Sequence, residues 1–402
     1  MAAPIPVSIH WQLSSYSGWG TVGINLFLEW ANDDELVPLT SVPHHNMIVV
    51  DGLRRQRLEP HLVQSEHLQS SIPRGGDGLV DINIPVLEAT GNSWHCEPHP
   101  GRLRGRPSIS LLVFENTRFS PSAIESARPY PLIVTASRWN EELLRAAGVE
   151  HVRTVWQGVD RTLFHPAPRS GWYRDRFVIF SGGKVELRKG QDLVLRTFRV
   201  FAKRHPESLL VTAWQSPWPQ FARDFGARHS VEPAPFTSSG QVDVKGWAVA
   251  NGIREDQVID IGHVANPLMP AVLREMDVAL FPNRAEGGTN LVAMEAMACG
   301  IPCVLSRNTG HRDIMTSPDA AEPNCYPLEH QRSVDDESRG TDGWGESDVD
   351  EAVEMLEAVW RDRETAAARG ARGAESMTAL SWRSQASALK QAIMPVLRAG
   401  TI

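Results

Sequence analysis

The stretch AEGGTNLVAMEAMACGIPCVLS, residues Ala285 to Ser306, decides the fold class that we expect for this chain. An apolar run from Val278 to Pro282 precedes it. The stretch itself reads as a glycine loop, a helix that stops at Gly300, and a second apolar strand. A strand, loop, helix and strand in this order form one βαβ unit, and such units build parallel sheets that helices cover. The sequence therefore predicts an α/β fold.

Two carboxylates frame the loop and the helix of this unit. Glu286 opens the Gly287–Gly288 turn, and Glu295 lies on the helix, which Thr289 or Asn290 can cap. The amides of such a loop, together with the helix N-terminus, favour an anion. Two acids beside an anion-binding loop favour a ligand with an anionic middle and hydroxylated ends. A nucleotide-sugar has this chemistry.

These residues resemble the donor signature of retaining glycosyltransferases of the GT-B fold, family 4, in which a Glu, a glycine-rich turn and a second Glu bind the donor. The resemblance implies that Glu286 lies by the donor sugar and that Glu295 holds the ribose hydroxyls. It is strongest from Pro131 to Ser306. The family usually has seven residues between the two acids, whereas GGTNLVAM has eight. An extra residue in the loop keeps the geometry, but one within the helix turns Glu295 away by ~100°.

Three cations follow the strand from Phe177 to Ser181, in the segment GGKVELRKG. The resemblance places Lys184 where many family members have Arg and Lys189 where they have Lys. We expect both to neutralise the donor diphosphate, beside Gly183 and the additional cation Arg188. Lys keeps the charge of Arg but loses its two-pronged grip on phosphate. The implied catalysis is electrostatic, through these cations, Glu286 and the helix terminus.

The first half of the chain opens in a similar way. Pro6 to Leu13 reads as a strand, SSYSGWGTVG as a glycine loop, and INLFLEWA as a helix from Ile24. In the resembling family the matching loop, here with Gly18 and Gly20, lies against the donor phosphate and the acceptor cleft. We look for the nucleotide base near His263, which follows a predicted strand.

Strands and helices alternate through both halves. Ser137 should cap a helix that Gly148 stops, and an amphipathic helix should run from Gln191 to Arg204. An acidic solvated loop is expected from Ser333 to Asp348, followed by helices over 349–367 and 381–397. Further strands are predicted at Met47–Asp51, Ile82–Leu87, Ser110–Phe114, Pro131–Ala136 and Ser208–Trp214.

The resemblance turns this pattern into a domain organisation. It implies a GT-B fold of class α/β, with two doubly wound Rossmann-like domains that face a central cleft. Residues 1–168 would form the acceptor-side domain, and residues 169–378 the donor-binding domain. QGVD and LFHP resemble the connection between the domains of the family. The C-terminal helix, within residues 379–402, would cross back to the first domain.

The acceptor side is marked by weaker similarities. GNSWHCEP and LLVFENTRF resemble segments of bacterial sugar transferases, and they make Asn92, His95 and Glu115 candidate acceptor residues. Trp19 lies in a loop that we expect to face the cleft, where its ring could stack on a sugar. The acceptor stays open between a glycan, a lipid-linked sugar, a peptide and a small molecule.

Metal ligation is not expected. Zinc sites usually need four ligands, and the cluster HCEPH from His95 to His99 lacks an evident full set. The Asp-x-Asp match at Asp348–Asp350 opens a helix, where acids meet the dipole. Cys299 and Cys303 have no second pair, so we expect them to be packed in the interior. The donor is a substrate, and no cofactor is predicted.

The composition limits which partners and which cellular compartment we expect. The 402 residues carry a net charge of -8, with 42% hydrophobic and 22% charged residues. This lacks the basic field of a general nucleic-acid binder, and no apolar run approaches the ~20 residues that span a bilayer. The start of the chain lacks the pattern of a signal peptide. With four scattered cysteines, we expect a cytoplasmic protein, and peripheral contact with a membrane is left open.

Four other functions compete with this prediction. A nucleotide-sugar epimerase or a phosphorylase could use the same two-domain fold, and so could a non-catalytic protein that only binds a nucleotide-sugar. A dinucleotide-dependent dehydrogenase is the fourth, because Gly18, Gly20 and Gly23 have the spacing G-x-G-x-x-G and Asp51 could bind a ribose. The dehydrogenase would leave the Glu286 loop without a role.

Overall fold

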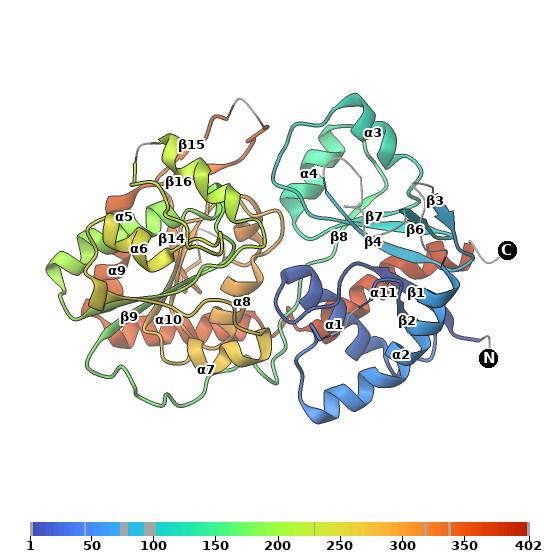
Figure 1. Ribbon diagram of the computed structural model, residues 1–402, viewed down its shortest axis with the longest axis horizontal. Coiled ribbons are helices and arrows are strands. Elements are labelled where there is room, and N and C mark those ends of the chain that lie inside the picture. Colours follow the sequence, from blue (N-terminus) through green and yellow to red (C-terminus); the bar gives the residue numbers. More distant parts are fainter. Residues whose placement is uncertain are drawn as a thin grey trace.

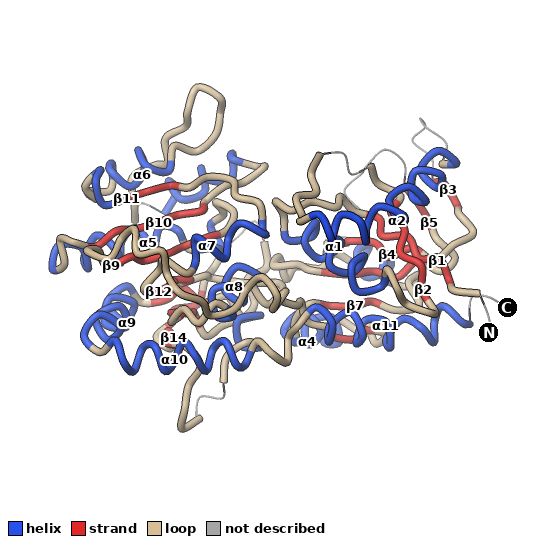
Figure 2. Tube along the Cα trace, turned by 90° about the horizontal axis from the view of Figure 1, so that it is seen from below, coloured by secondary structure: helices blue, strands red, loops and turns tan. Residues whose placement is uncertain are grey.

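The computed structural model describes residues 3–43, 46–72, 79–91, 102–228, 230–316, 320–336 and 339–399. Its two main sheets are parallel and have six strands each, one sheet in each half of the chain. Figure 1 shows the half that contains the N-terminus at the right and the other half at the left. Helices lie on both faces of each sheet (Figure 2). The prediction of two doubly wound α/β halves is confirmed.

The first sheet has the strand order β2-β1-β4-β6-β7-β8. The chain therefore first adds β2 on one side of β1 and then adds the later strands on the other side, so the strand order reverses at β1. Open α/β sheets bind ligands beyond the carboxyl ends of the strands at such a reversal. Two short strands, β3 and β5, pair with each other outside this sheet. The strands are β1 (Ile5–His10), β2 (Leu36–Thr40), β3 (Leu79–Asp81), β4 (Val86–Thr90), β5 (Arg102–Arg104), β6 (Ser108–Leu112), β7 (Ile133–Thr135) and β8 (Val152–Thr154).

Helices bury both faces of the first sheet. Adjacent residues of β6 divide between the two sides, because Leu111 belongs to one core and Leu112 to the other. Ser137 caps α4 and Gly148 follows it with φ +85°, as predicted. On one side lie α1 (Gly18–Trp30), α2 (Gly52–Ser71) and α11 (Trp382–Ala399), and on the other lie α3 (Pro121–Ala127) and α4 (Arg138–Ala146).

The second sheet has the order β11-β10-β9-β12-β13-β14, so its reversal lies between β9 and β12. The loops after these two strands carry the GGKVELRKG segment and the Glu286 turn. A hairpin-like pair, β15 with β16, is antiparallel and separate. The strands are β9 (Phe177–Gly182), β10 (Ser208–Ala213), β11 (Val258–Asp260), β12 (Val278–Phe281), β13 (Cys303–Ser306), β14 (Tyr326–Leu328), β15 (Gln331–Ser333) and β16 (Gly345–Ser347).

Both faces of the second sheet are also buried. In β9, Phe177 and Ile179 belong to one core, whereas Val178 and Phe180 belong to the other. This explains why the strand reads as a continuous apolar run. The first core contains α5 (Gln191–Arg204), α6 (Val244–Ala250) and α9 (Val349–Arg361), and the second contains α7 (Met269–Leu273) and α8 (Leu291–Ala298) with α10 (Arg363–Ser376) against it.

The chain passes between the halves twice, at one place. The amide of Val159 donates to the carbonyl of Leu380, and the amide of Trp382 donates to the carbonyl of Val159. Gly158 fits beside Trp382, where an added Cβ would lie 2.7 Å from the Cα of Trp382. From this crossing, α11 runs along α1 and completes the core of the first half (Figure 1). The predicted return of the last helix is confirmed.

Two predictions in the first half are wrong. Met47–Asp51 is not a strand, because the backbone of Val49 forms its hydrogen bonds with the hydroxyl of Ser15. The neighbour of β1 is β2 instead. Asp51 caps α2 and pairs with Arg54, so it does not follow a strand as a ribose-binding acid would. The predicted strand at Ile82–Leu87 lies further along the chain, as β4.

Three other boundaries also differ from the expectation. The first helix begins at Gly18 and not at Ile24, because Ser17 caps it. The acidic segment from Ser333 to Asp348 is not a simple solvated loop, because it contains β16 and the buried Trp344. The expected helix 349–367 is divided into α9 and α10. None of the helices in the described part of the chain is long and apolar enough to cross a membrane.

Candidate functional site

Loops at the carboxyl ends of the two sheets meet between the halves. The amide of Asn266, which follows β11, donates to the carbonyl of Ser15, which follows β1. Gly18, at the start of α1, approaches Leu291, at the start of α8, where an added Cβ would lie 3.7 Å from Leu291 Cδ1. The two helix N-termini thus point to one region, which also holds the Glu286 loop. We take this region as the candidate site.

Glu286 is the centre of the charges in this region. Its side chain is buried, and Lys189 Nζ lies 2.5 Å from its Oε1. Arg188 Nη1 lies 3.4 Å from its Oε2, and the side-chain Nδ2 of Asn283 also donates to Oε1. Arg188 in turn binds Glu186 at 2.6 Å. The GGKVELRKG segment and the Glu286 loop are therefore joined by ion pairs.

The charges of this cluster shift its pKa values. Burial would raise the pKa of Glu286, but Lys189 and Arg188 outweigh it and hold this pKa at about 2. Burial lowers the pKa of Lys189 and Arg188 adds to the shift, against the effect of Glu286. Burial opposes the charge of Arg188 as well, yet Glu115, Glu186 and Glu286 keep its pKa raised. Glu286 is thus an ionised carboxylate throughout the neutral range.

Of the three cations in the GGKVELRKG segment, Lys184 has the most exposed side chain. Its side chain is 40% exposed, and its Nζ lies 3.7 Å from Glu186 and 4.8 Å from the ring centre of Trp218. Neighbouring Gly183 has φ +127°, in the region that favours glycine. Lys184 can therefore reach a ligand without leaving a buried ion pair, whereas Arg188 and Lys189 cannot.

Residues of the first half contact the Gly-Gly turn directly. The amide of Gly287 donates to Glu115 Oε1 at 3.3 Å, and the hydroxyl of Ser137 donates to the carbonyl of Gly287. The amide and hydroxyl of Thr289 donate to Gln157 Oε1 at 3.3 and 3.2 Å. Glu115, a predicted acceptor residue, thus contacts the predicted donor loop. Ser137 and Gln157 were not predicted as site residues.

Asn290 caps α8, as one of the two alternatives proposed. It has φ +60°, and its side chain accepts from the amide of Ala293. Its Nδ2 donates to His311 Nε2 at 2.9 Å, while His311 Nδ1 bonds Ser306. Burial lowers the pKa of His311 to about 4, so the ring is neutral and accepts from Asn290. His311 was missed by the sequence analysis.

Arg284 is a second residue that the sequence analysis missed. Its guanidinium is 1% exposed and binds both carboxylate oxygens of Asp192 at 2.8 and 2.7 Å. It also donates to the carbonyl of Leu187 and to Glu346. Arg284 therefore fixes the loop after β9, the start of α5 and the Glu286 loop in one arrangement.

A short turn after β13 packs against the Glu286 loop and forms hydrogen bonds with its backbone. The amide of Glu286 donates to Thr309 Oγ1 at 2.8 Å, and the amide of Gly310 donates to the carbonyl of Glu286 at 3.0 Å. An added Cβ at Gly310 would lie 1.8 Å from the carbonyl oxygen of Gly288. Only glycine fits at this position without moving the loop.

Glu295 lies on α8 and is buried, so it is not a surface carboxylate. Its Oε1 accepts from Asn266 Nδ2 at 2.5 Å. Burial raises the pKa of Glu295 to about 8, although the bond from Asn266 opposes the shift. The residues from Gly287 to Asn290 all precede the helix. The carboxyl is available as a polar group inside the region between the halves.

Four other predicted residues also lie around this region. Gly18 opens α1, but the amide of Gly20 bonds Ser17 and an added Cβ there would lie 2.3 Å from the carbonyl of Ser14. Gly20 is therefore packed closely against the loop after β1, and its expected donor-binding role stays a prediction. His263 lies with its ring centre 5.8 Å from that of Tyr16. Trp19 is half-buried and packs against Trp11, 5.3 Å between ring centres.

Some predicted residues cannot be placed. Asn92, His95 and the rest of the HCEPH cluster lie outside the described residues. Within the described ranges, no three His, Cys, Asp or Glu side chains gather as a metal site would require. Asp348 caps α9 and accepts from two backbone amides, which agrees with its expected capping role. Cys299 and Cys303 are free and buried, as expected.

Comparison with known families agrees with this geometry. Residues 175–322 match the family model described as Glycosyl transferases group 1. This part of the second half is therefore similar to the group 1 glycosyltransferases. Residues 268–389 also match a model described as Family 4 Glycosyltransferase in conflict systems. Both matches include Glu286 and Glu295.

Two curated relatives illustrate the similarity. A D-inositol 3-phosphate glycosyltransferase of Arthrobacter sp. (strain FB24) is 29% identical over 171 residues, which are 41% of this chain and 36% of that protein. A mannosylfructose-phosphate synthase of Agrobacterium fabrum is 27% identical over 168 residues, 40% of this chain and 34% of that protein. The chain thus spans about a third of the length of these relatives.

Solved structures extend the similarity to the whole fold. Sucrose-phosphate synthase from Thermosynechococcus elongatus has a TM-score of 0.63 and 14% identity, over 98% of this chain and 100% of that one. Anabaena HepE in complex with UDP-glucose has a TM-score of 0.58 and 13% identity, over 98% and 100%. The two domains of this chain therefore have the GT-B arrangement of glycosyltransferases.

Proposed function

We propose that this chain is a retaining glycosyltransferase that moves a sugar from a nucleotide-diphosphate sugar to an acceptor hydroxyl, without a metal ion. The observation that carries the proposal is the Glu286–Lys189 ion pair at 2.5 Å, in the loop before α8. It combines a carboxylate, a cation and a helix N-terminus at the sheet reversal of the group 1 domain.

The diphosphate would bind beside Lys184, Lys189 and the N-terminus of α8. Negative charge grows on the diphosphate as the bond to the sugar breaks, and pre-positioned cations and amide dipoles stabilise it. Removing one such group typically lowers the rate on the order of 10²-fold or more. Arg284 holds the loop that carries Arg188 and Lys189, and Glu286 holds Lys189 before the donor binds. Lys184, which is 40% exposed, can turn toward the phosphate.

Glu286 would act on the sugar. When a diphosphate draws Lys189 toward itself, the carboxylate loses part of its ion pair and can accept hydrogen bonds from sugar hydroxyls or stabilise positive charge at the anomeric carbon. Its low pKa, about 2, keeps it ionised for either role. Retention of the anomeric configuration is proposed from the resemblance of the donor signature to that of retaining enzymes.

Glu295 would hold the ribose. It is a buried carboxyl on α8, the helix that follows the Glu286 loop, and Asn266 orients it. The solved complex of Anabaena HepE contains UDP-glucose, and on that basis we propose a UDP-sugar as the first donor to test. The acceptor would enter from the side of the first domain.

The test is a thermal-shift and calorimetry panel of UDP-, GDP-, ADP- and TDP-sugars, with and without EDTA. We expect one nucleotide to raise the melting temperature of the wild type in EDTA, and Glu295→Ala to lose that rise. Glu354→Ala, an exposed residue of α9, is the matched control and should keep it. If none of the four nucleotide-sugars raises the melting temperature of the wild type, the donor assignment is refuted. If the rise is seen only without EDTA, the metal-free mechanism is refuted.

A further inference from the structure

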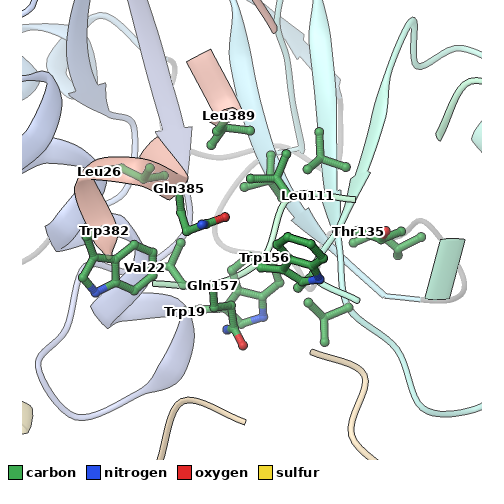
Figure 3. A pocket seen from close by; sticks show the side chains of 15 residues that line it. Trp19, Val22, Leu26, Leu111, Thr135, Trp156, Gln157, Trp382, Gln385 and Leu389 are labelled. Carbon is green, nitrogen blue, oxygen red and sulfur yellow. The ribbon is translucent and has the colours of Figure 1, made fainter. Parts of the chain in front are cut away.

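A small pocket of about 50 Å³ lies inside the first domain. It is enclosed by α1, by α11 and by the residues at the carboxyl ends of β6, β7 and β8 (Figure 3). Among its lining side chains only Thr135, Gln157 and Gln385 belong to polar residue types, and the others are aliphatic or indole groups. An apolar pocket at the carboxyl ends of parallel strands is where an α/β domain holds a ligand.

The two ends of the pocket differ in exposure. Leu26, Leu112 and Leu389 are 2%, 0% and 4% exposed and close the inner end. Trp19 and Gln157 are half-buried, so the pocket opens on their side. Figure 3 shows Trp156, Trp19 and Gln157 together on one side of the pocket and Leu389 on the opposite side.

The open end adjoins the candidate donor loop. Gln157 Oε1 accepts from the amide and the hydroxyl of Thr289. An added Cβ at Gly288 would lie 2.7 Å from Gln157 Oε1 and 3.4 Å from the Cβ of Ala136, which also lines the pocket. A group seated in the pocket would therefore emerge at the turn that follows Glu286.

We propose that this pocket receives an apolar group of the acceptor, so that the acceptor is an alcohol with a small aliphatic group next to its reactive hydroxyl. The assignment rests on the proposed glycosyltransferase function. The acceptor oxygen bonds to the anomeric carbon as the bond to the diphosphate oxygen breaks. The diphosphate leaves with the electron pair and takes up the hydroxyl proton. A fully hydroxylated sugar would leave its hydroxyls without partners among these side chains.

The volume limits the size of that group. One water-sized sphere needs roughly 10–15 Å³ of such volume, so a pocket of about 50 Å³ accommodates a branched group of a few carbon atoms. Burying two methyl groups is worth about tenfold in affinity. The preference for an apolar over a polar alcohol of similar size is therefore measurable.

The experiment compares 3-methyl-1-butanol with glycerol on the full chain, by ligand-observed NMR titration and by sugar transfer from the nucleotide-sugar that stabilises the protein. Val22→Phe fills the pocket from α1. Val155→Phe fills it from a half-buried position that tolerates a larger side chain more easily. Val63→Phe, exposed on α2 and outside the lining, is the control.

The wild type and Val63→Phe should bind the apolar alcohol about tenfold more tightly than glycerol, and both filled variants should lose this preference while nucleotide-sugars still stabilise them. The pocket assignment is overturned if the wild type binds the two alcohols equally, or if both Val22→Phe and Val155→Phe keep the preference. Neither result bears on the donor function. If no nucleotide-sugar stabilises the wild type, the donor function fails, and the assignment of this pocket to an acceptor fails with it.

Discussion

Glu115 of the first domain lies 3.2 Å from the guanidinium of Arg188 in the second domain. The same carboxylate accepts from the amide of Gly287. The carboxylate thus binds two groups, the Arg188 guanidinium and the Gly287 amide, in the region where we expect the diphosphate. Under the proposed function, a bound phosphate and Glu115 would compete for the same cation and amide, so donor binding would be linked to this contact between the domains.

Glu115→Gln should weaken this link. We expect a nucleoside diphosphate to bind several-fold more tightly, since its competitor has lost the charge, and the free protein to be more open. Calorimetry measures the first effect and small-angle X-ray scattering the second. Glu150→Gln, an exposed carboxylate of the same domain, should change neither. Weaker nucleotide binding by Glu115→Gln would mean that Glu115 supports the donor and does not compete with it.

Lys189→Ala tests the catalytic cation. Sugar transfer should fall on the order of 10²-fold, because the leaving diphosphate loses a fixed charge. The control is Lys203→Ala, since Lys203 is exposed on α5 and should behave as the wild type. The rate is measured with saturating donor, so that a mere loss of affinity is separated from a loss of turnover. A variant with full turnover would remove Lys189 from the mechanism.

Arg284 and Arg332 bind the same carboxylate, Glu346, from opposite sides. Arg284 is 1% exposed and Arg332 is 78% exposed. Arg284→Met should cost about 3–5 kcal/mol, because it leaves Asp192 buried without a partner. Arg332→Met should cost less than ~1 kcal/mol. Urea unfolding measures both free energies, and equal losses would contradict the difference in burial.

Glu295 should make donor binding depend on pH. Its pKa of about 8 leaves it protonated at pH 7, whereas ribose hydroxyls donate best to a carboxylate. Binding should therefore release a proton, and affinity should rise as the pH approaches 8, by at most tenfold per pH unit. Calorimetry in buffers of different ionisation enthalpy counts the protons. Glu295→Gln should show no such release, and a wild type without release would exclude a bond to the ionised carboxyl.

The same group affects folding stability. The folded state keeps the Glu295 proton up to about pH 8, whereas the unfolded chain loses it near its ordinary pKa of about 4.5. The unfolded state therefore binds fewer protons in this window, and the contribution of Glu295 to stability falls as the pH rises from 4.5 to 8. Glu295→Gln should flatten this part of the curve of unfolding free energy against pH.

Gly310→Ala should disturb the donor loop without touching the donor. The added methyl group would meet the carbonyl of Gly288, so the loop must shift and transfer should fall at least tenfold. Gly52→Ala is the control, because nothing lies within 4 Å of its added Cβ. Comparable rates for the two variants would mean that the position of the Gly288 carbonyl does not matter for transfer.

Local patterns predicted the parts of the fold that depend on neighbours in sequence. The amphipathic helix expected from Gln191 to Arg204 is α5 with the same bounds, and Ser137 caps α4 as its residue type suggests. The strand expected at Met47–Asp51 is not formed, because Ser15, far away in the chain, takes its backbone hydrogen bonds.

The residues of the candidate site also divide into those that local sequence predicts and those that it does not. Glu286, Asn290 and Glu295 belong to one segment whose order of residues suggests their roles. Arg284 escaped notice because its partner Asp192 is 92 positions away. Gln157 contacts Thr289 across 132 positions. No periodicity or motif marks such pairs. The first exists only after β9 and β12 have paired in the second sheet, and the second only after the two halves have met.

The hydrogen bonds between Val159 and the segment Leu380–Trp382 make the second domain an insertion into the first. The chain enters and leaves it through two adjacent extended segments, and no strand of the first sheet lies between them in sequence. We therefore expect the first half to tolerate a second half from another sequence at these two positions, because α1 and α11 would keep their shared core. In such a chimera the first half would stay intact, and under the proposed function the choice of donor would change with the grafted half.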